Sequence, residues 1–279
     1  MVRFITLLFL LSSFPAFSQD TIPSRWEMSF SAGFSSPIGP YKKKVSDWGQ
    51  PPFQLGFIQY DQLQKRGNAA AKSGNYYQVR VDRRFLKGFG FWSAYRFSNN
   101  GFDPSGFGQL LRDQRSSPLL PVTSLTITNP GSNNSILPFE FDGTTFRFIH
   151  DDYQIHHLLV GYSYTFGWDK QLSFSWKQGL GYGNLGNLDY EVIVPTRVPS
   201  KFVHQPSKKT ASAVLMNFGA STRLRLGSQV LWSIDVDYMH GNFSYEQEII
   251  YAPKNTKVLI DDSVNLRTLN IGSSLIFTW

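Results

Sequence analysis

The 279-residue sequence contains no cysteine, and its longest apolar run, residues 5–11, is short. Without cysteine, disulfide scaffolds, thiolate zinc sites and cysteine nucleophiles are excluded. A membrane-spanning helix needs roughly 20 apolar residues, so a helical membrane protein is excluded as well. Charged residues are scarce at 17%, whereas aromatic residues reach 16%. This composition is too rich in large apolar side chains for a disordered chain.

The first 18 residues have the pattern of a cleavable signal peptide. Arg3 precedes an apolar stretch over residues 4–14, and Ala16 and Ser18 stand at positions −3 and −1 of the expected cut. The alternative is an N-terminal core helix. Export leaves residues 19–279 as one mature domain and argues against nucleic acid as a partner of this basic chain, whose net charge is +7.

Beyond the signal segment, apolar residues recur with a period of two, which is typical of strands with one apolar face. In residues 172–183, for example, the even positions are mostly large and apolar, and the odd positions are small or polar. Segments of this kind predict eight strands, at residues 26–34, 75–85, 89–98, 157–166, 172–183, 214–225, 230–238 and 266–279.

Both an exported soluble sandwich and a membrane barrel would show this alternation, so the polar face decides between them. Six positive and four negative side chains on that face could pair inside a narrow bore. Most of the strands are longer than the usual 5 or 6 residues and suit a tilted bilayer crossing. We therefore predict an all-β, antiparallel up-and-down transmembrane barrel with a lumen network of Glu27, Arg80, Asp82, Arg84, Arg96, Lys177, Arg223, Arg225, Asp235 and Asp237.

The connections between strands support the barrel. Residues 86–88, 169–171 and 227–229 form three-residue turns, and an odd number keeps both apolar faces on one side. The last turn sets Arg223 opposite Ser233 and diagonal to Asp235, which predicts an ion pair between Arg223 and Asp235. These short turns alternate with four long connections, at residues 35–74, 99–152, 184–210 and 242–265, as in an outer-membrane barrel with periplasmic termini.

Two stretches inside the long loops have hairpin patterns. Residues 139–148 surround Asp142 and Gly143, a type I′ turn pair, and residues 245–260 surround a second turn. Such hairpins would extend the barrel wall above the membrane. The alternative is that they cross it and make ten strands, but five-residue arms are too short for that.

In these features the chain resembles the OmpA-like family, the small eight-stranded porin-family barrels of Gram-negative outer membranes. The resemblance rests on the signal peptide, the three short turns, the stretch MSFSAGFSSPIGPY at residues 28–41 and the closing strand LNIGSSLIFTW. It implies that the terminal aromatic, Trp279, is the membrane-insertion signal read by the barrel-assembly machinery. No peptidoglycan-binding domain follows Trp279, so wall anchoring is not expected.

Histidines are the best candidates for chemistry, and most have a simpler interpretation. His156 and His157 are adjacent, so a regular strand points them to opposite faces and they cannot chelate one metal. His150 precedes two aspartates in what we interpret as a polar loop. His240 has Ser244 four residues on, whereas a lipid A deacylase of this barrel class has its serine two residues after the histidine. We expect no catalytic, cofactor or metal site, with such a hydrolase as a minor alternative.

The long loops carry many lysines and arginines, which are either solvated or in contact with anionic lipopolysaccharide: Lys42, Lys43, Lys44, Lys65, Arg66, Lys72, Lys201, Lys208 and Lys209. The sequence thus predicts a monomeric outer-membrane barrel with a plugged lumen. It would act as a structural or interaction protein whose loops meet lipopolysaccharide or an extracellular or envelope protein. A small channel is the alternative.

Overall fold

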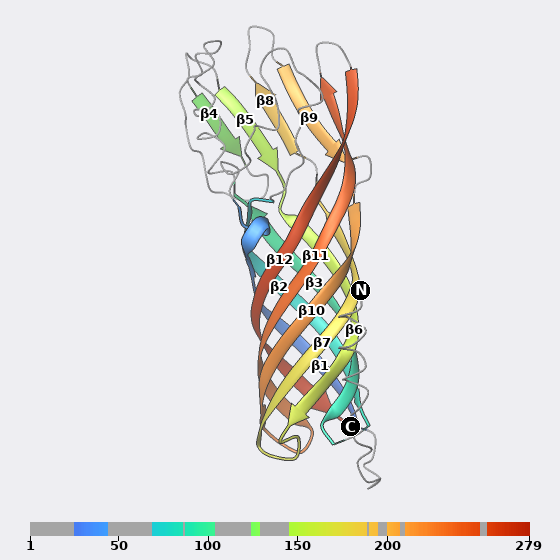
Figure 1. Ribbon diagram of the computed structural model, residues 1–279. Coiled ribbons are helices and arrows are strands. Elements are labelled where there is room, and N and C mark those ends of the chain that lie inside the picture. The colour runs from blue at the N-terminus through green and yellow to red at the C-terminus, as the bar shows by residue number, and fades with distance from the viewer. Residues whose placement is uncertain are drawn as a thin grey trace.

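The computed structural model describes residues 25–43, 69–85, 87–103, 124–128, 145–188, 190–194, 200–206, 210–251 and 256–279 (Figure 1). Apart from the short 3-10 helix η1 (Gly39–Tyr41), the regular elements of this part of the chain are strands. No helix in the described residues is long and apolar enough to cross a membrane. The predicted signal segment and its cut lie outside the described residues.

Eight long strands make a closed barrel. They are β1 (Arg25–Pro37), β2 (Ala71–Arg84), β3 (Phe89–Phe102), β6 (Tyr153–Phe166), β7 (Leu172–Gly186), β10 (Thr210–Arg225), β11 (Val230–Tyr251) and β12 (Thr256–Thr278). Each pairs antiparallel with the next in this order, and β12 returns to pair with β1. The predicted eight-stranded up-and-down barrel is confirmed, and the ten-stranded alternative is wrong.

Period-two alternation places large apolar side chains outside the barrel. On β10, Val214 is 69% exposed, whereas its neighbour Leu215 points inward and is fully buried. Exposed aromatic or aliphatic side chains project from every barrel strand, among them Phe34, Tyr77, Phe91, Leu158, Phe174, Val214, Ile234 and Leu275. A barrel exterior of this kind can be stable only against lipid, because water would meet a continuous apolar surface.

The periplasmic turns largely follow the predicted pattern. Gly88 has φ of +80°, the left-handed conformation that the first turn needs, and Leu226 N–H donates to Val230 O at 3.0 Å across the third. The second turn differs: β6 ends at Phe166, so five residues rather than three join it to β7. The register is as predicted, but Gly167 at φ +63° ends the strand early.

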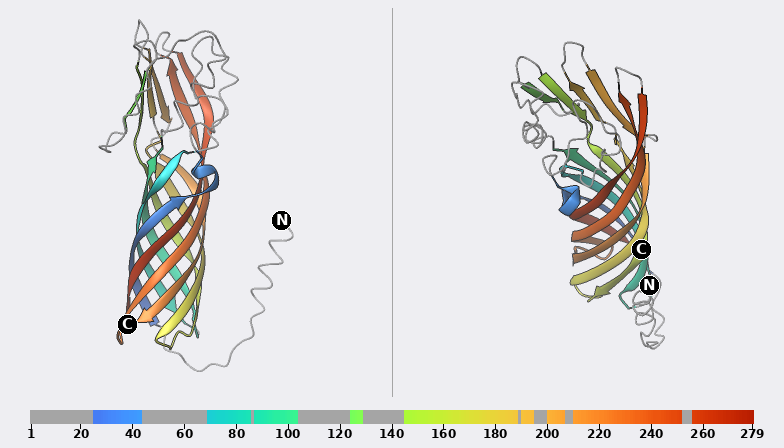
Figure 2. Two further views of the ribbon diagram at one scale, coloured as in Figure 1. Left: turned by 90° about the vertical axis from the view of Figure 1, so that its left-hand side faces the viewer. Right: turned by 45° about the horizontal axis from the view of Figure 1, so that its top comes forward.

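Above the barrel, β11 and β12 continue as a hairpin up to the pair Tyr251 and Thr256, which confirms the predicted hairpin at residues 245–260. Four short strands extend a sheet from the upper end of β11 (Figure 2): β9 (Ser200–Pro206), β8 (Tyr190–Val194), β5 (Thr145–His150) and β4 (Ser124–Thr128). The first arm of the predicted hairpin at residues 139–148 lies outside the described residues. Its second arm falls on β5, whose neighbours in the sheet are β4 and β8.

The lipid-facing side can be tested at Ile234, which is 46% exposed on the outer face of β11. Ile234→Arg should lower the free energy of unfolding in lipid by about 2 to 4 kcal/mol if the position lies near the bilayer midplane. Urea titration of the folded band, which migrates differently from the boiled protein on a detergent gel, measures the change. Ile234→Leu is the control, and an equal loss in both variants would contradict the assignment of this face to lipid.

Candidate functional site

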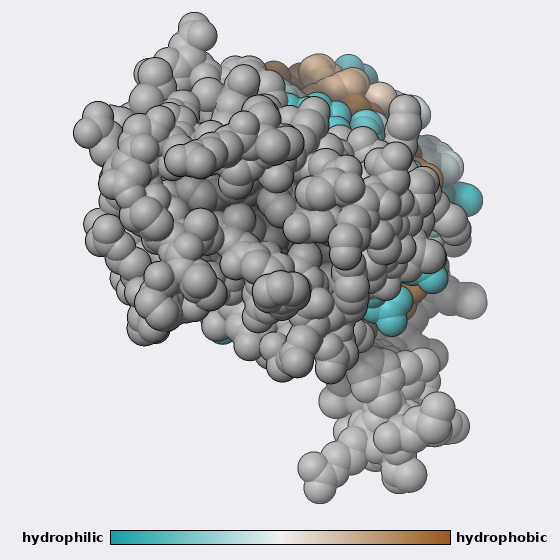
Figure 3. All heavy atoms as spheres, turned by 90° about the horizontal axis from the view of Figure 1, so that it is seen from above, coloured by the Kyte–Doolittle hydropathy of each residue, from teal (hydrophilic) through white to brown (hydrophobic). Residues whose placement is uncertain are grey.

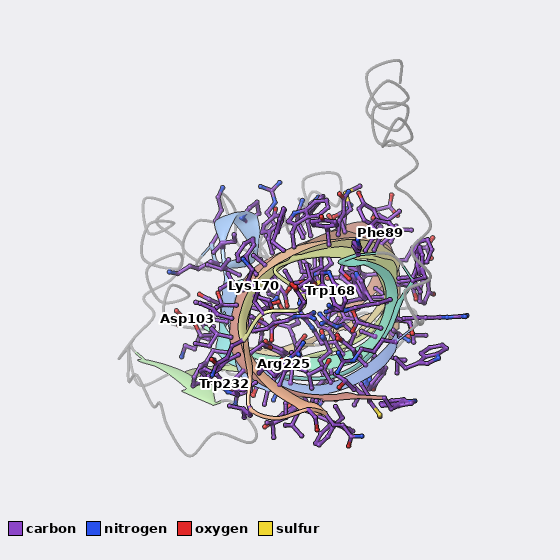
Figure 4. The ribbon with its side chains drawn as sticks, turned by 90° about the horizontal axis from the view of Figure 1, so that it is seen from below. Phe89, Asp103, Trp168, Lys170, Arg225 and Trp232 are labelled. Atoms are coloured by element: carbon purple, nitrogen blue, oxygen red, sulfur yellow. The ribbon has the colours of Figure 1, made fainter. Side chains whose placement is uncertain are left out.

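The lumen is the candidate site, because most of the charged side chains in the barrel wall point into it. All ten residues of the predicted network lie on the inner face, and nine of them are buried, with Arg225 half-buried at the periplasmic mouth. Seen from below, side chains fill the ring of strands (Figure 4). The network spans several strands and forms two groups of ion pairs and one separate pair, Arg80 with Asp82.

Glu27 organises the group nearest the periplasmic mouth. One of its carboxylate oxygens accepts from Arg84 Nη2 and Arg223 Nη1, each at 3.0 Å. The ladder sets Arg223 opposite Ser233, as predicted, but the expected ion pair with Asp235 is wrong. The Arg223 side chain instead reaches Glu27 on β1, beyond β11 and β12, because inside a barrel the lumen brings together side chains that a flat sheet would keep apart.

Asp237 organises the central group. Its carboxylate lies 2.5 Å from Arg96 Nη2 and 2.7 Å from Lys177 Nζ, which joins β11 to β3 and β7. Lys177 is also 3.6 Å from Asp235, whose carboxylate accepts from Ser233 at 2.9 Å. Burial makes each of these pairs costly to break, because a lone charge in a narrow bore has little water to solvate it.

Two further contacts of the polar half lie outside these groups. Arg80 Nε donates to Asp82 at 2.7 Å along one face of β2. At the mouth, Arg225 Nη2 donates to Trp168 O at 3.0 Å and ties the β6–β7 turn to the end of β10. Viewed from below, Trp168 and Arg225 lie within the ring of strands (Figure 4). The turn therefore covers part of the periplasmic opening.

The extracellular half of the lumen is mainly apolar, with buried Asn100 and Asp262 as polar exceptions, which the sequence reasoning did not anticipate. Fully or almost fully buried side chains from six barrel strands pack there: Phe102, Ile155, Leu159, Leu185, Leu215, Met239, Phe243, Val264 and Leu266. Tyr41 of η1 closes this layer against Tyr153, with ring centroids 6.0 Å apart, and burial raises the pKa of Tyr41 well above its ordinary value. On β6 the inward positions between His157 and the extracellular end are Ile155 and Tyr153, so extending the period-two pattern to them would have predicted the apolar layer.

Inward glycines make room for aromatic rings in the bore. A Cβ atom at Gly179 would lie 2.5 Å from the Trp92 ring, and one at Gly161 would lie 2.8 Å from it. The Tyr76 ring covers Gly33 and Gly272 in the same way. The small residues on the lumen face thus leave little free space, since the rings occupy it.

The histidines lie as their positions in the strands predict. His157 points inward with Nε2 3.0 Å from Ser98 Oγ, and His156 points outward with Nδ1 2.6 Å from Tyr95 OH. His240 donates from Nδ1 to Leu266 O at 3.2 Å, so this hydrogen bond does not involve Ser244. Within the described residues no cluster of three or more His, Asp or Glu could hold a metal ion.

Trp279 lies at the periplasmic rim, 62% exposed on the lipid side. Its backbone N–H and C=O exchange hydrogen bonds with Trp26 on β1, at 3.1 and 3.0 Å. The role of Trp279 as an insertion signal stays a prediction. The closed ladder and the apolar exterior together decide the class of protein.

The chain is an eight-stranded outer-membrane β-barrel. No family model matches it, and no curated protein matches it. Its fold is similar to Neisserial surface protein A, with 10% identity over 93% of this chain and 99% of the other and a TM-score of 0.40. It is also similar to a major outer membrane protein from Thermus thermophilus, with 10% identity over 92% of this chain and 100% of the other and a TM-score of 0.45. OprG from Pseudomonas aeruginosa is similar too, with 12% identity over 91% of this chain and 95% of the other and a TM-score of 0.41. Assignment to the OmpA-like family in particular stays a prediction.

Proposed function

We propose that this barrel is a sealed membrane anchor, a structural or interaction protein that acts through its extracellular sheet and not through transport or catalysis. The observation that carries the proposal is the filling of the lumen by two different layers. Ion pairs around Glu27 and Asp237 occupy the periplasmic half, and buried apolar side chains around Phe243 occupy the extracellular half.

The two layers lie in series along the bore. An ion would have to displace paired charges in the first layer and then enter a layer lined mainly by apolar side chains, at a cost of several kcal/mol for a desolvated charge. An apolar molecule would meet the opposite obstacle, because the charged layer offers it no favourable contact. This arrangement supports a plug for both classes of solute.

The extracellular sheet is the part of the molecule suited to contact a partner. It adds β9, β8, β5 and β4 to the hairpin of β11 and β12, above the ring of barrel strands (Figure 1). β4 ends the sheet, and among the described residues no strand pairs with its outer side. An open strand edge can pair with an extended segment of another protein, so an extracellular or envelope protein is the partner class we propose.

Planar-bilayer recordings test the seal. We expect little conductance from the wild type and from either single variant, Asp237→Ala or Phe243→Ala, because each leaves one layer intact. The double variant should conduct, since it breaches both layers. Migration as a compact unboiled band verifies that each protein is folded. Large, stable wild-type currents would refute the plug and favour a small channel.

A further inference from the structure

Above the apolar belt, the outer faces of β11 and β12 carry directly opposed side chains of matching chemistry. Reading away from the membrane, the pairs are Tyr238 and Leu269, His240 and Arg267, Asn242 and Asn265, Ser244 and Ser263, and Glu246 and Asp261. Opposed like charges destabilise a ladder. The basic pair lies directly above the last apolar pair, at the boundary between the two kinds of surface.

The basic pair belongs to a larger cationic cluster, because η1 packs beside Arg267. Ile38 N–H donates to Arg267 O at 2.9 Å, and a Cβ atom at Gly39 would lie 3.5 Å from Arg267 Cδ. Lys42 and Lys43 follow the helix directly and are exposed. We call the four residues Lys42, Lys43, His240 and Arg267 the headgroup cluster.

The headgroup cluster has no carboxylate partner within the described residues. The Arg267 side chain donates to the neutral Asn265 at 3.2 Å, and His240 donates to a backbone carbonyl. Lys72, another cation of the extracellular rim, is by contrast 3.8 Å from the Asp103 carboxylate. The cluster therefore concentrates positive charge that the described part of the protein does not neutralise, which favours an anion from outside.

The surface below the cluster indicates which anion it is. Phe34, Leu269 and Ile271 are exposed on β1 and β12 directly beneath it, at 71%, 37% and 50%. In the view from above, brown apolar and teal polar residues lie side by side along part of the edge of the molecule (Figure 3). A ligand with an anionic head and acyl chains would fill both surfaces at once, whereas a free anion would use only the upper one.

We propose that the headgroup cluster binds the phosphate of an outer-leaflet lipid whose acyl chains lie along Phe34, Leu269 and Ile271. Arg267 supplies a planar donor fork for phosphate oxygens, and the two lysines add point charges beside it. Because Nδ1 of His240 donates to Leu266 O, its Nε2 can donate to a phosphate oxygen only when the ring is the imidazolium. The site lies outside both the lumen and the extracellular sheet, so it does not depend on the proposed function.

Native mass spectrometry of the full barrel in a neutral detergent tests the site, with diphosphorylated lipid A as the probe and phosphatidylcholine as the comparison lipid. We expect lipid A adducts to outnumber phosphatidylcholine adducts. The triple variant Arg267→Gln, Lys42→Gln, Lys43→Gln should bind lipid A about tenfold more weakly. These side chains are exposed or half-buried, so the variant should fold, and heat-modifiable migration verifies that it does.

The matched control removes three positive charges elsewhere, with Lys72→Gln, Lys87→Gln and Lys170→Gln, and should change lipid A binding less than twofold. An equal loss in the control would overturn the proposal, because general charge would explain it. Unchanged binding by the Arg267 variant would overturn it too. If inorganic phosphate binds the cluster as tightly as lipid A does, the apolar surface beneath it contributes nothing, and the cluster is a free-anion site, which contradicts a lipid site.

Discussion

Replacing Asp237 with alanine should lower the free energy of unfolding of the folded barrel by about 3 to 5 kcal/mol. Its carboxylate contacts Arg96 at 2.5 Å and Lys177 at 2.7 Å, and all three side chains are buried. Asp235 partly compensates Lys177, but Arg96 loses the carboxylate with which it pairs. Urea unfolding in detergent micelles, followed by tryptophan fluorescence, measures the change.

Two variants sharpen this test. Asp169→Ala removes an exposed carboxylate from the β6–β7 turn and should change stability by no more than about 0.5 kcal/mol. The double variant Asp237→Ala, Arg96→Met should recover part of the loss, since it removes the stranded charge together with its partner. A double variant as unstable as the sum of both single variants would show that the two side chains are not coupled.

Phe243→Ala should cost about 3 to 5 kcal/mol by leaving a cavity in the apolar layer. Phe243 is fully buried, and its ring lies 3.0 Å from where a Cβ atom at Gly183 would be, beside Leu215. Neighbouring backbone belongs to a closed ladder and cannot collapse into the space. The same urea titration measures the effect.

Phe34→Ala is the matched control, because Phe34 is the same residue type but is 71% exposed on the lipid side. Lipid can fill the space that its ring leaves, so a smaller loss is expected. Phe243→Leu should fall between the wild type and the alanine variant. Equal losses at Phe34 and Phe243 would contradict a packed apolar layer inside the bore.

Much of the fold could be predicted because it depends on short-range rules. Period two determines which side chains face lipid, and odd turn lengths determine register, so the pairing of Arg223 with Ser233 was predicted to the residue. The predicted length of the β6–β7 turn was wrong because Gly167 adopts a positive φ and ends β6, and strand patterning does not detect such a residue. The sheet of β4, β5, β8 and β9 was missed because three of its pairings, β4 with β5, β5 with β8 and β9 with β11, join segments that are far apart in the chain; only β8 and β9 pair locally.

The site was predicted as a set of inward residues but not as a set of contacts. Alternation identifies Glu27 and Arg223 as inward, yet only the closed barrel brings them to 3.0 Å from each other. Neighbour rules favour the diagonal partner, Asp235, on the adjacent strand. The long Arg223 side chain instead reaches across the bore to Glu27, because the closed barrel brings strands that are not neighbours in the sheet within reach of each other.

The hydrogen bonds between Trp26 and Trp279 join the first and last strands of the barrel, and they constrain the order in which it can assemble. β1 has no partner on one side until β12, the last of the barrel strands to be synthesised, is present. Until then the backbone groups on the open sides of β1 and of the newest strand have no ladder partner, and lipid cannot satisfy them. Insertion must therefore follow synthesis, and the exported chain has to be shielded from pairing with other chains while it waits for its own final strand.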